Sequence, residues 1–124
     1  MKKSTTIIFA VIFGISVSAQ KKVDTTFGVS AVCDMCEDRI ESAYDVKGIV
    51  MADYDLNKKK LHVVYKTNVF TDILDVHRIA AKVGHDTDKI KATNEAYSSL
   101  HHCCKYREAT NAIECSGDNK TFQD

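Results

Sequence analysis

The sequence has no proline and no tryptophan, and only five of its 124 residues are glycine. It has no internal repeat and no low-complexity tract, so it does not predict a repeat architecture or a solenoid. No Ser/His/Asp set, paired carboxylates or phosphate-binding loop stands out, and the sequence therefore does not predict an enzyme. The length suits one small domain with a tail.

An excess of charge of one sign is also absent, because 17 basic residues balance 17 acidic ones. The one basic cluster that stands out is Lys58-Lys59-Lys60, which falls where a hairpin turn is expected. Such a cluster is more typical of a solvated loop than of a phosphate-binding patch. Nucleic acid and anionic membranes are therefore not expected as partners.

Long apolar runs are missing as well. The run from Ile7 to Val17 has 11 residues, whereas a membrane-spanning helix needs about 20. Lys2 and Lys3 precede this run, and Val17-Ser18-Ala19 follows the small-x-small pattern of a cleavage site. We predict a signal peptide at 1–19, cleaved after Ala19, and an exported, periplasmic protein without stable membrane insertion afterwards.

Apolar spacing predicts a β-α-β-β-α-β order in the domain at 20–92. The strands are expected at 25–32, 49–56, 60–66 and 85–90, and the helices at 36–44 and 71–83. This order is typical of the α+β ferredoxin-like sandwich, with four antiparallel strands and two helices on one face. We expect residues 93–124 to form a Cys/His-containing C-terminal extension, helical from 94 to about 104 and partly disordered beyond it.

Cys33 and Cys36 are the most informative residues, because they lie where a predicted strand passes into a predicted helix. Two thiols at this spacing can converge on one point. The start of a helix, with Asp34 as its predicted N-cap, also favours the thiolate form. Such a pair suits a soft metal ion or a redox disulfide.

A dithiol oxidoreductase of thioredoxin type places a cis-proline beside its cysteines, which a chain without proline cannot do. A structural disulfide would close a very short loop and stabilise little.

Metal binding is therefore the preferred function of this pair. Two bare thiolates suit linear coordination of Hg(II) or Cu(I), whereas Zn(II) prefers four ligands; Zn(II) and Cd(II) remain open.

Several motifs accompany the cysteine pair: Arg39-Ile40-Glu41, Val46-Lys47-Gly48-Ile49, Ile79-Ala80 and Val83-Gly84. Together with Cys33-x-x-Cys36 they resemble the heavy-metal-associated (HMA) domain family over residues 25–90, in exported single-domain forms such as periplasmic mercury-binding proteins. The resemblance implies a carrier that binds one soft ion through Cys33 and Cys36. It would pass that ion to a membrane metal transporter or P-type ATPase. We expect a monomer, with a metal-bridged dimer as the alternative.

Two features depart from the family pattern. Ser30-Ala31-Val32 stands where members often have Gly-Met-x. His85 follows the glycine after the second helix, where members often have Tyr, Phe or Lys. His85 is a candidate third ligand, although a partly exposed loop histidine is the simpler interpretation. His62 and His77 are expected at the surface or its boundary.

His101, His102, Cys103 and Cys104 form a second cluster of candidate ligands. Adjacent residues do not share a helix face, so all four cannot bind one ion on a continuous helix. Three arrangements stay open at this point: an ion held by His101 with Cys104, a disulfide to Cys115, or a return of the segment over the Cys33/Cys36 loop that completes a larger site. The functional alternatives are a thiol oxidoreductase and a sensing or docking module that uses this tail.

Overall fold

The computed structural model describes residues 21–108. Its core is a three-stranded antiparallel sheet made of β1 (Lys22–Gly28), β2 (Ile49–Asp55) and β3 (Lys60–Lys66), in the order β1-β3-β2. The central strand, β3, has the bounds that the sequence predicts. Along it Leu61, Val63 and Tyr65 are buried and the residues between them are half-buried, so one face of the sheet carries the core.

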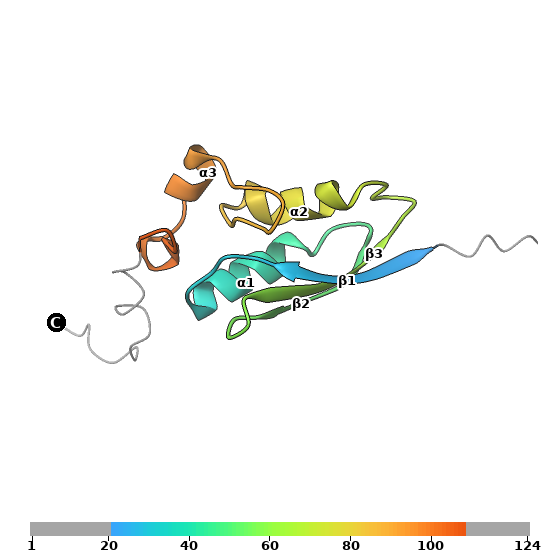
Figure 1. Ribbon diagram of the computed structural model, residues 1–124, viewed down its shortest axis with the longest axis horizontal. Helices are drawn as coiled ribbons and strands as arrows, with labels where there is room; N and C mark the ends of the chain where they lie inside the picture. Colours follow the sequence, from blue (N-terminus) through green and yellow to red (C-terminus); the bar gives the residue numbers. More distant parts are fainter. Residues whose placement is uncertain (1–20, 109–124) are drawn as a thin grey trace, which may run out of the picture.

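Two helices cover that face, α1 (Asp34–Ala43) and α2 (Ile73–Lys82) (Figure 1). Helical spacing places Cys36, Ile40 and Tyr44 on the buried side of α1. The Tyr44 hydroxyl donates a hydrogen bond of 2.8 Å to the carbonyl of Val76 in α2, which fastens the two helices together. The ferredoxin-like class predicted from the sequence is confirmed.

The fourth strand expected at 85–90 does not form; this segment makes a single bridge, between Val29 and Thr87. The reason is a tight turn, in which the backbone N–H of Thr87 donates to the Ile90 carbonyl at 2.8 Å. The carboxylate of Asp88 also accepts from the backbone N–H of Gly28 at 2.6 Å, which takes up a donor that a neighbouring strand would use.

His77 is buried in α2, which corrects the surface position expected for it. Its ring stacks on Phe27 with the centroids 3.8 Å apart, and its Nδ1 lies 2.7 Å from the hydroxyl of Thr87. It lies next to Val76 and three positions before Ala80, which are also buried, so the buried face of α2 includes His77.

The third helix is split rather than continuous to Cys104. It comprises α3 (Asn94–Ser98), capped by the Thr93 hydroxyl, and a 3-10 turn, η1 (His102–Cys104). Tyr106 and Arg107 follow this turn, and we call residues 94–107 the strap. The strap returns to the start of α1, where η1 contacts that helix (Figure 1).

No helix in residues 21–108 is both long and apolar enough to cross a membrane. Residues 1–19 and Cys115 lie outside the described residues. The signal peptide and a disulfide to Cys115 therefore remain predictions.

The free energy of unfolding should fall as the pH is lowered from 7.5 to 5.5. Burial lowers the pKa of His77 and of His85 below the ordinary value of 6.5. The unfolded chain then binds more protons than the folded one below about pH 6.5, and each buried histidine contributes a slope of at most about 1.4 kcal/mol per pH unit. Urea unfolding at several pH values measures the slope.

His77→Phe keeps a ring against Phe27 and should reduce this slope. Val76→Ala is the control, since it should lower stability at every pH without changing the slope. An unchanged slope in the His77 variant would contradict the assignment.

Candidate metal centre

Cys33 and Cys36 meet at the start of α1. Cys33 is the N-cap residue, where Asp34 was predicted, and its side chain makes no capping hydrogen bond. Its carbonyl instead accepts from the backbone N–H groups of Cys36 and Glu37, at 2.9 and 3.3 Å. The first turn of the helix thus places the two sulfurs 3.5 Å apart. This separation is far longer than the roughly 2.05 Å of a disulfide bond, and both thiols are free.

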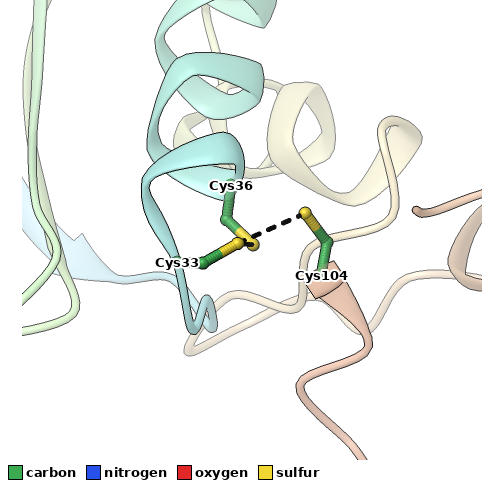
Figure 2. Close-up of side chains that lie close together, drawn as sticks. All are labelled: Cys33, Cys36 and Cys104. Carbon is green, nitrogen blue, oxygen red and sulfur yellow. Dashed lines mark hydrogen bonds between the residues drawn. The ribbon is translucent and has the colours of Figure 1, made fainter. Parts of the chain in front are cut away.

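A third sulfur joins them from the strap. Cys104 Sγ lies 3.8 Å from Cys33 Sγ, and all three sulfurs lie within 4.8 Å of one another (Figure 2). Cys33 Sγ also lies 3.5 Å from the carbonyl oxygen of Cys103. Of the arrangements open at the sequence level, the structure contains the return of the tail over the cysteine pair, with Cys104 as the residue that reaches it.

The three sulfurs are buried rather than presented at an open loop. Cys36 and Cys104 have no exposed surface, and Cys33 is 7% exposed. Burial raises the pKa of Cys36, and the backbone hydrogen bonds at the helix start lower it by less. Burial also raises the pKa of Cys104, and the nearby sulfurs of Cys36 and Cys33 raise it further. The free site therefore favours neutral thiols, and a bound cation would have to displace their protons.

His85 lies in the interior, which corrects the expectation of a partly exposed histidine. Its Nδ1 lies 2.8 Å from the carbonyl oxygen of Ser30, so Nδ1 carries the hydrogen and donates it. Its Nε2 is buried and has no hydrogen-bond partner among the described residues. His85 does not belong to the group of ligand atoms formed by the three cysteines.

The other residues of the second cluster do not join the three sulfurs of Cys33, Cys36 and Cys104. His101, His102 and Cys103 offer ligand atoms within 4.8 Å of one another, but both histidines are exposed. Cys103 is disulfide-bonded, so it cannot act as a thiolate in this state. Cys115, which the sequence offers as a disulfide partner for one of the two tail cysteines, lies outside the described residues. The two adjacent cysteines of the 3-10 turn thus differ: Cys104 is a free thiol beside the pair at the start of α1, and Cys103 is part of a disulfide.

Tyr106 fastens the strap to the loop that follows α2. Its hydroxyl donates to the carbonyl of Gly84 at 2.7 Å and accepts from the backbone N–H of Asp86 at 2.9 Å. Its ring stacks on His85 with the centroids 5.6 Å apart. The buried histidine therefore supports the strap that carries Cys104.

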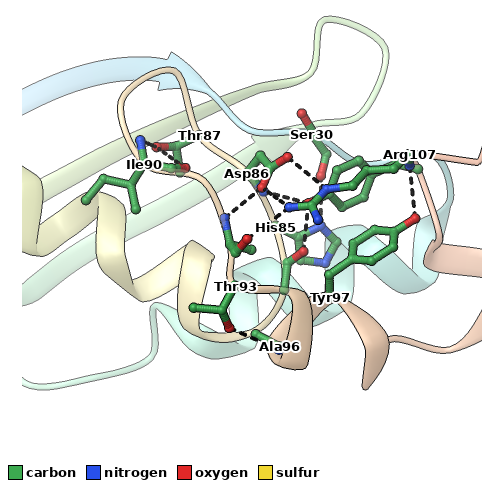
Figure 3. Close-up of polar contacts among 12 residues, drawn as sticks. Ser30, His85, Asp86, Thr87, Ile90, Thr93, Ala96, Tyr97 and Arg107 are labelled. Carbon is green, nitrogen blue, oxygen red and sulfur yellow. Dashed lines mark hydrogen bonds and ion pairs between the residues drawn. The ribbon is translucent and has the colours of Figure 1, made fainter.

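Arg107 provides a second fastening (Figure 3). Its guanidinium donates to both carboxylate oxygens of Asp86, at 2.7 and 3.2 Å, and to the carbonyl of Ala92 at 3.0 Å. It also lies over the ring of Tyr97, 4.3 Å from the centroid. Burial raises the pKa of Asp86, but the hydrogen bonds from Arg107 and the Ala92 N–H outweigh it and hold that pKa below its usual value.

The sequence reasoning missed these fastening residues. The helical spacing of Tyr97, Leu100 and Cys104 indicated only a third helix. The bidentate pair of Asp86 with Arg107 has no local signal, because its members are 21 positions apart.

The sequence matches no protein-family model and no curated protein. Among solved structures, a Bacillus anthracis protein named for copper-ion binding superposes with a TM-score of 0.52 at 21% identity, covering 56% of this chain and 100% of that one. The CopZ metallochaperone gives a TM-score of 0.47 at 21% identity, with 52% and 98% covered. Oxidised MerP from Ralstonia metallidurans gives 0.49 at 17% identity, with 55% and 96% covered.

The chain has the ferredoxin-like fold of heavy-metal-associated domains. The similarity to the Bacillus structure supports this fold, and at 21% identity it shows the fold alone. The Bacillus structure covers 56% of this chain, so the strap and its cysteines are described from the structure of this protein alone.

Arg107→Ala should make the thiols of Cys36 and Cys104 react faster with iodoacetamide. The variant loses the hydrogen bonds to Asp86, and a loss of about 1.4 kcal/mol in strap docking corresponds to a tenfold larger open fraction. Mass spectrometry of timed samples gives the rate for each cysteine.

Arg78→Ala is the matched control, since Arg78 pairs with Asp75 on the exposed side of α2. It should leave the labelling rates unchanged. Equal rates in the Arg107 variant and the parent would mean that this ion pair does not hold the strap over the sulfurs.

Proposed function

We propose that this protein binds a thiophilic metal ion through Cys33 and Cys36 and delivers it to another protein. The observation that supports this most directly is the pair of free sulfurs, 3.5 Å apart and buried at the start of α1. The fold shared with metal-binding domains is consistent with it. The ion is the cargo of this carrier rather than a part needed for catalysis.

The donor set favours soft ions. Thiolate sulfur selects Hg(II), Cu(I), Cd(II) or Zn(II) over ions that prefer oxygen. A thiolate in a buried pocket is unfavourable by itself, and a bound cation offsets that charge. Hg(II) and Cu(I) are the ions we favour, because both accept two or three sulfurs, whereas Zn(II) prefers four ligands.

The proposed delivery step is ligand exchange with thiols of the acceptor. An incoming thiolate bonds to the ion as one of the two carrier sulfurs leaves, and a second exchange completes the transfer. We propose a membrane metal transporter or P-type ATPase as the acceptor. Export by the predicted signal peptide at 1–19 would place the carrier in the periplasm.

A second candidate function is thiol–disulfide exchange, because Cys33 Sγ is close to the sulfurs of both Cys36 and Cys104. An oxidoreductase would catalyse repeated reduction of an insulin disulfide in the presence of a reductant. A carrier should show no turnover in that assay while it binds metal tightly.

Cys33→Ser and Cys36→Ser should each weaken the binding of Hg(II) and Cu(I) by at least about 100-fold. This exceeds the effect of losing a group that only orients a ligand, which costs about 10- to 100-fold. Competition of the fully reduced protein with a small dithiol, read by native mass spectrometry, measures the affinity.

Met35→Leu is the matched control, because Met35 lies between the two cysteines and is 48% exposed. It should bind like the parent. Parent-like affinity in both serine variants would place the metal site elsewhere in the chain.

A further inference from the structure

The strap brings Cys104 to the cysteine pair although 71 positions separate Cys104 from Cys33. Resting on the function proposed above, we propose that Cys104 is a third thiolate ligand. The site would then be a three-sulfur centre for divalent or trivalent thiophilic ions, such as Hg(II) or trivalent arsenic, rather than a linear two-sulfur site for Cu(I).

The spacing of the sulfurs supports three-fold coordination. With a metal–sulfur bond of about 2.3 Å, a linear ion holds its two sulfurs about 4.6 Å apart, and a trigonal-planar ion holds each pair about 4.0 Å apart. The observed separations are 3.5 Å from Cys33 to Cys36 and 3.8 Å from Cys33 to Cys104, with every pair below 4.8 Å. A trigonal ion needs the smaller rearrangement.

The net charge of a three-thiolate site also favours divalent and trivalent ions. Three thiolates leave a net charge of −2 around a monovalent ion, −1 around a divalent ion and zero around a trivalent one. Cys36 and Cys104 have no exposed surface, and uncompensated charge is costly in such a place. The third sulfur should therefore favour Hg(II) and trivalent arsenic more than it favours Cu(I).

Cys104 is held in place by its surroundings. Its backbone N–H donates to the His101 carbonyl at 2.8 Å, and its carbonyl accepts from the N–H of Tyr106 at the same distance. Leu100, four positions earlier, packs against Gly84, where an added Cβ would lie 2.8 Å from the Leu100 side chain. This close packing presents the sulfur in a defined position rather than on a loose tail.

Uptake balances without an oxidant or reductant. Arsenous acid exchanges its three hydroxyl groups for three sulfurs, and each thiol proton leaves with a hydroxyl as water, giving three waters. Hg(II) displaces up to three thiol protons. Delivery is the thiol exchange proposed above: each acceptor thiol bonds to the ion as one carrier sulfur leaves, and the acceptor's proton passes to the sulfur that leaves.

X-ray absorption of the full-length reduced protein, loaded with one equivalent of Hg(II) and freed of small thiols, counts the sulfurs around the ion. We expect three in the parent, two in Cys104→Ser and three in Cys103→Ser, the adjacent matched control. Cys104→Ser should also lower the affinity for arsenite by at least about 100-fold, and that for Cu(I) by less than about tenfold.

Two sulfurs around Hg(II) in the parent would overturn the third ligand, and this measurement needs no variant to fold. Loss of the third sulfur in Cys103→Ser, with Cys104→Ser unchanged, would overturn it as well. Either result leaves the function proposed for Cys33 and Cys36 intact if the parent still binds tightly. A parent that takes up no Hg(II), Cu(I) or arsenite would instead refute that function itself.

Discussion

Three cysteine sulfurs from two distant segments share one buried pocket, and the other features of the site depend on this arrangement. Burial raises the pKa of Cys36 and of Cys104, so these two are neutral thiols in the free protein and a bound cation would have to displace their protons. Only two short segments are needed to build this pocket. The first turn of α1 places two of the sulfurs, and one ordered strap adds the third.

The strap in turn is held by polar and aromatic contacts, in addition to the burial of Leu100 and Cys104 in the core. Asp86 is the central residue, because its carboxylate accepts from Arg107 and from the backbone of Ala92. Tyr106 joins the backbone at Gly84 and Asp86 to the buried ring of His85. A histidine that could be taken for a ligand from its position in the sequence therefore acts here as a packing surface for the segment that carries a candidate ligand.

The sequence was sufficient for the parts that follow local rules. Alternation predicted the bounds of β3, and apolar spacing predicted a helix at 36–44, close to the observed α1. The position of Cys33 and Cys36 also follows from their spacing at a strand-to-helix junction. These features depend on neighbours a few positions away, which periodicity describes well.

The remaining features are set by contacts between distant positions. The segment at 85–90 is expected to be a strand, but the turn at Thr87 and the hydrogen bond from the Gly28 N–H to Asp88 give it another conformation. His77 was misjudged because the width of a helix's buried face depends on what packs against it. Cys104 lay in a cluster with several open pairings, and the pair of Asp86 with Arg107 is visible only in three dimensions.

The closed strap also has a kinetic consequence. Because Cys36 and Cys104 are fully covered, an acceptor of the proposed carrier could not reach an ion bound to them until the strap opened. Delivery would then follow the frequency of that opening, and its rate would level off as the acceptor becomes abundant. In the proposed carrier, the strap would therefore set the rate of release and shield the bound ion from other thiols.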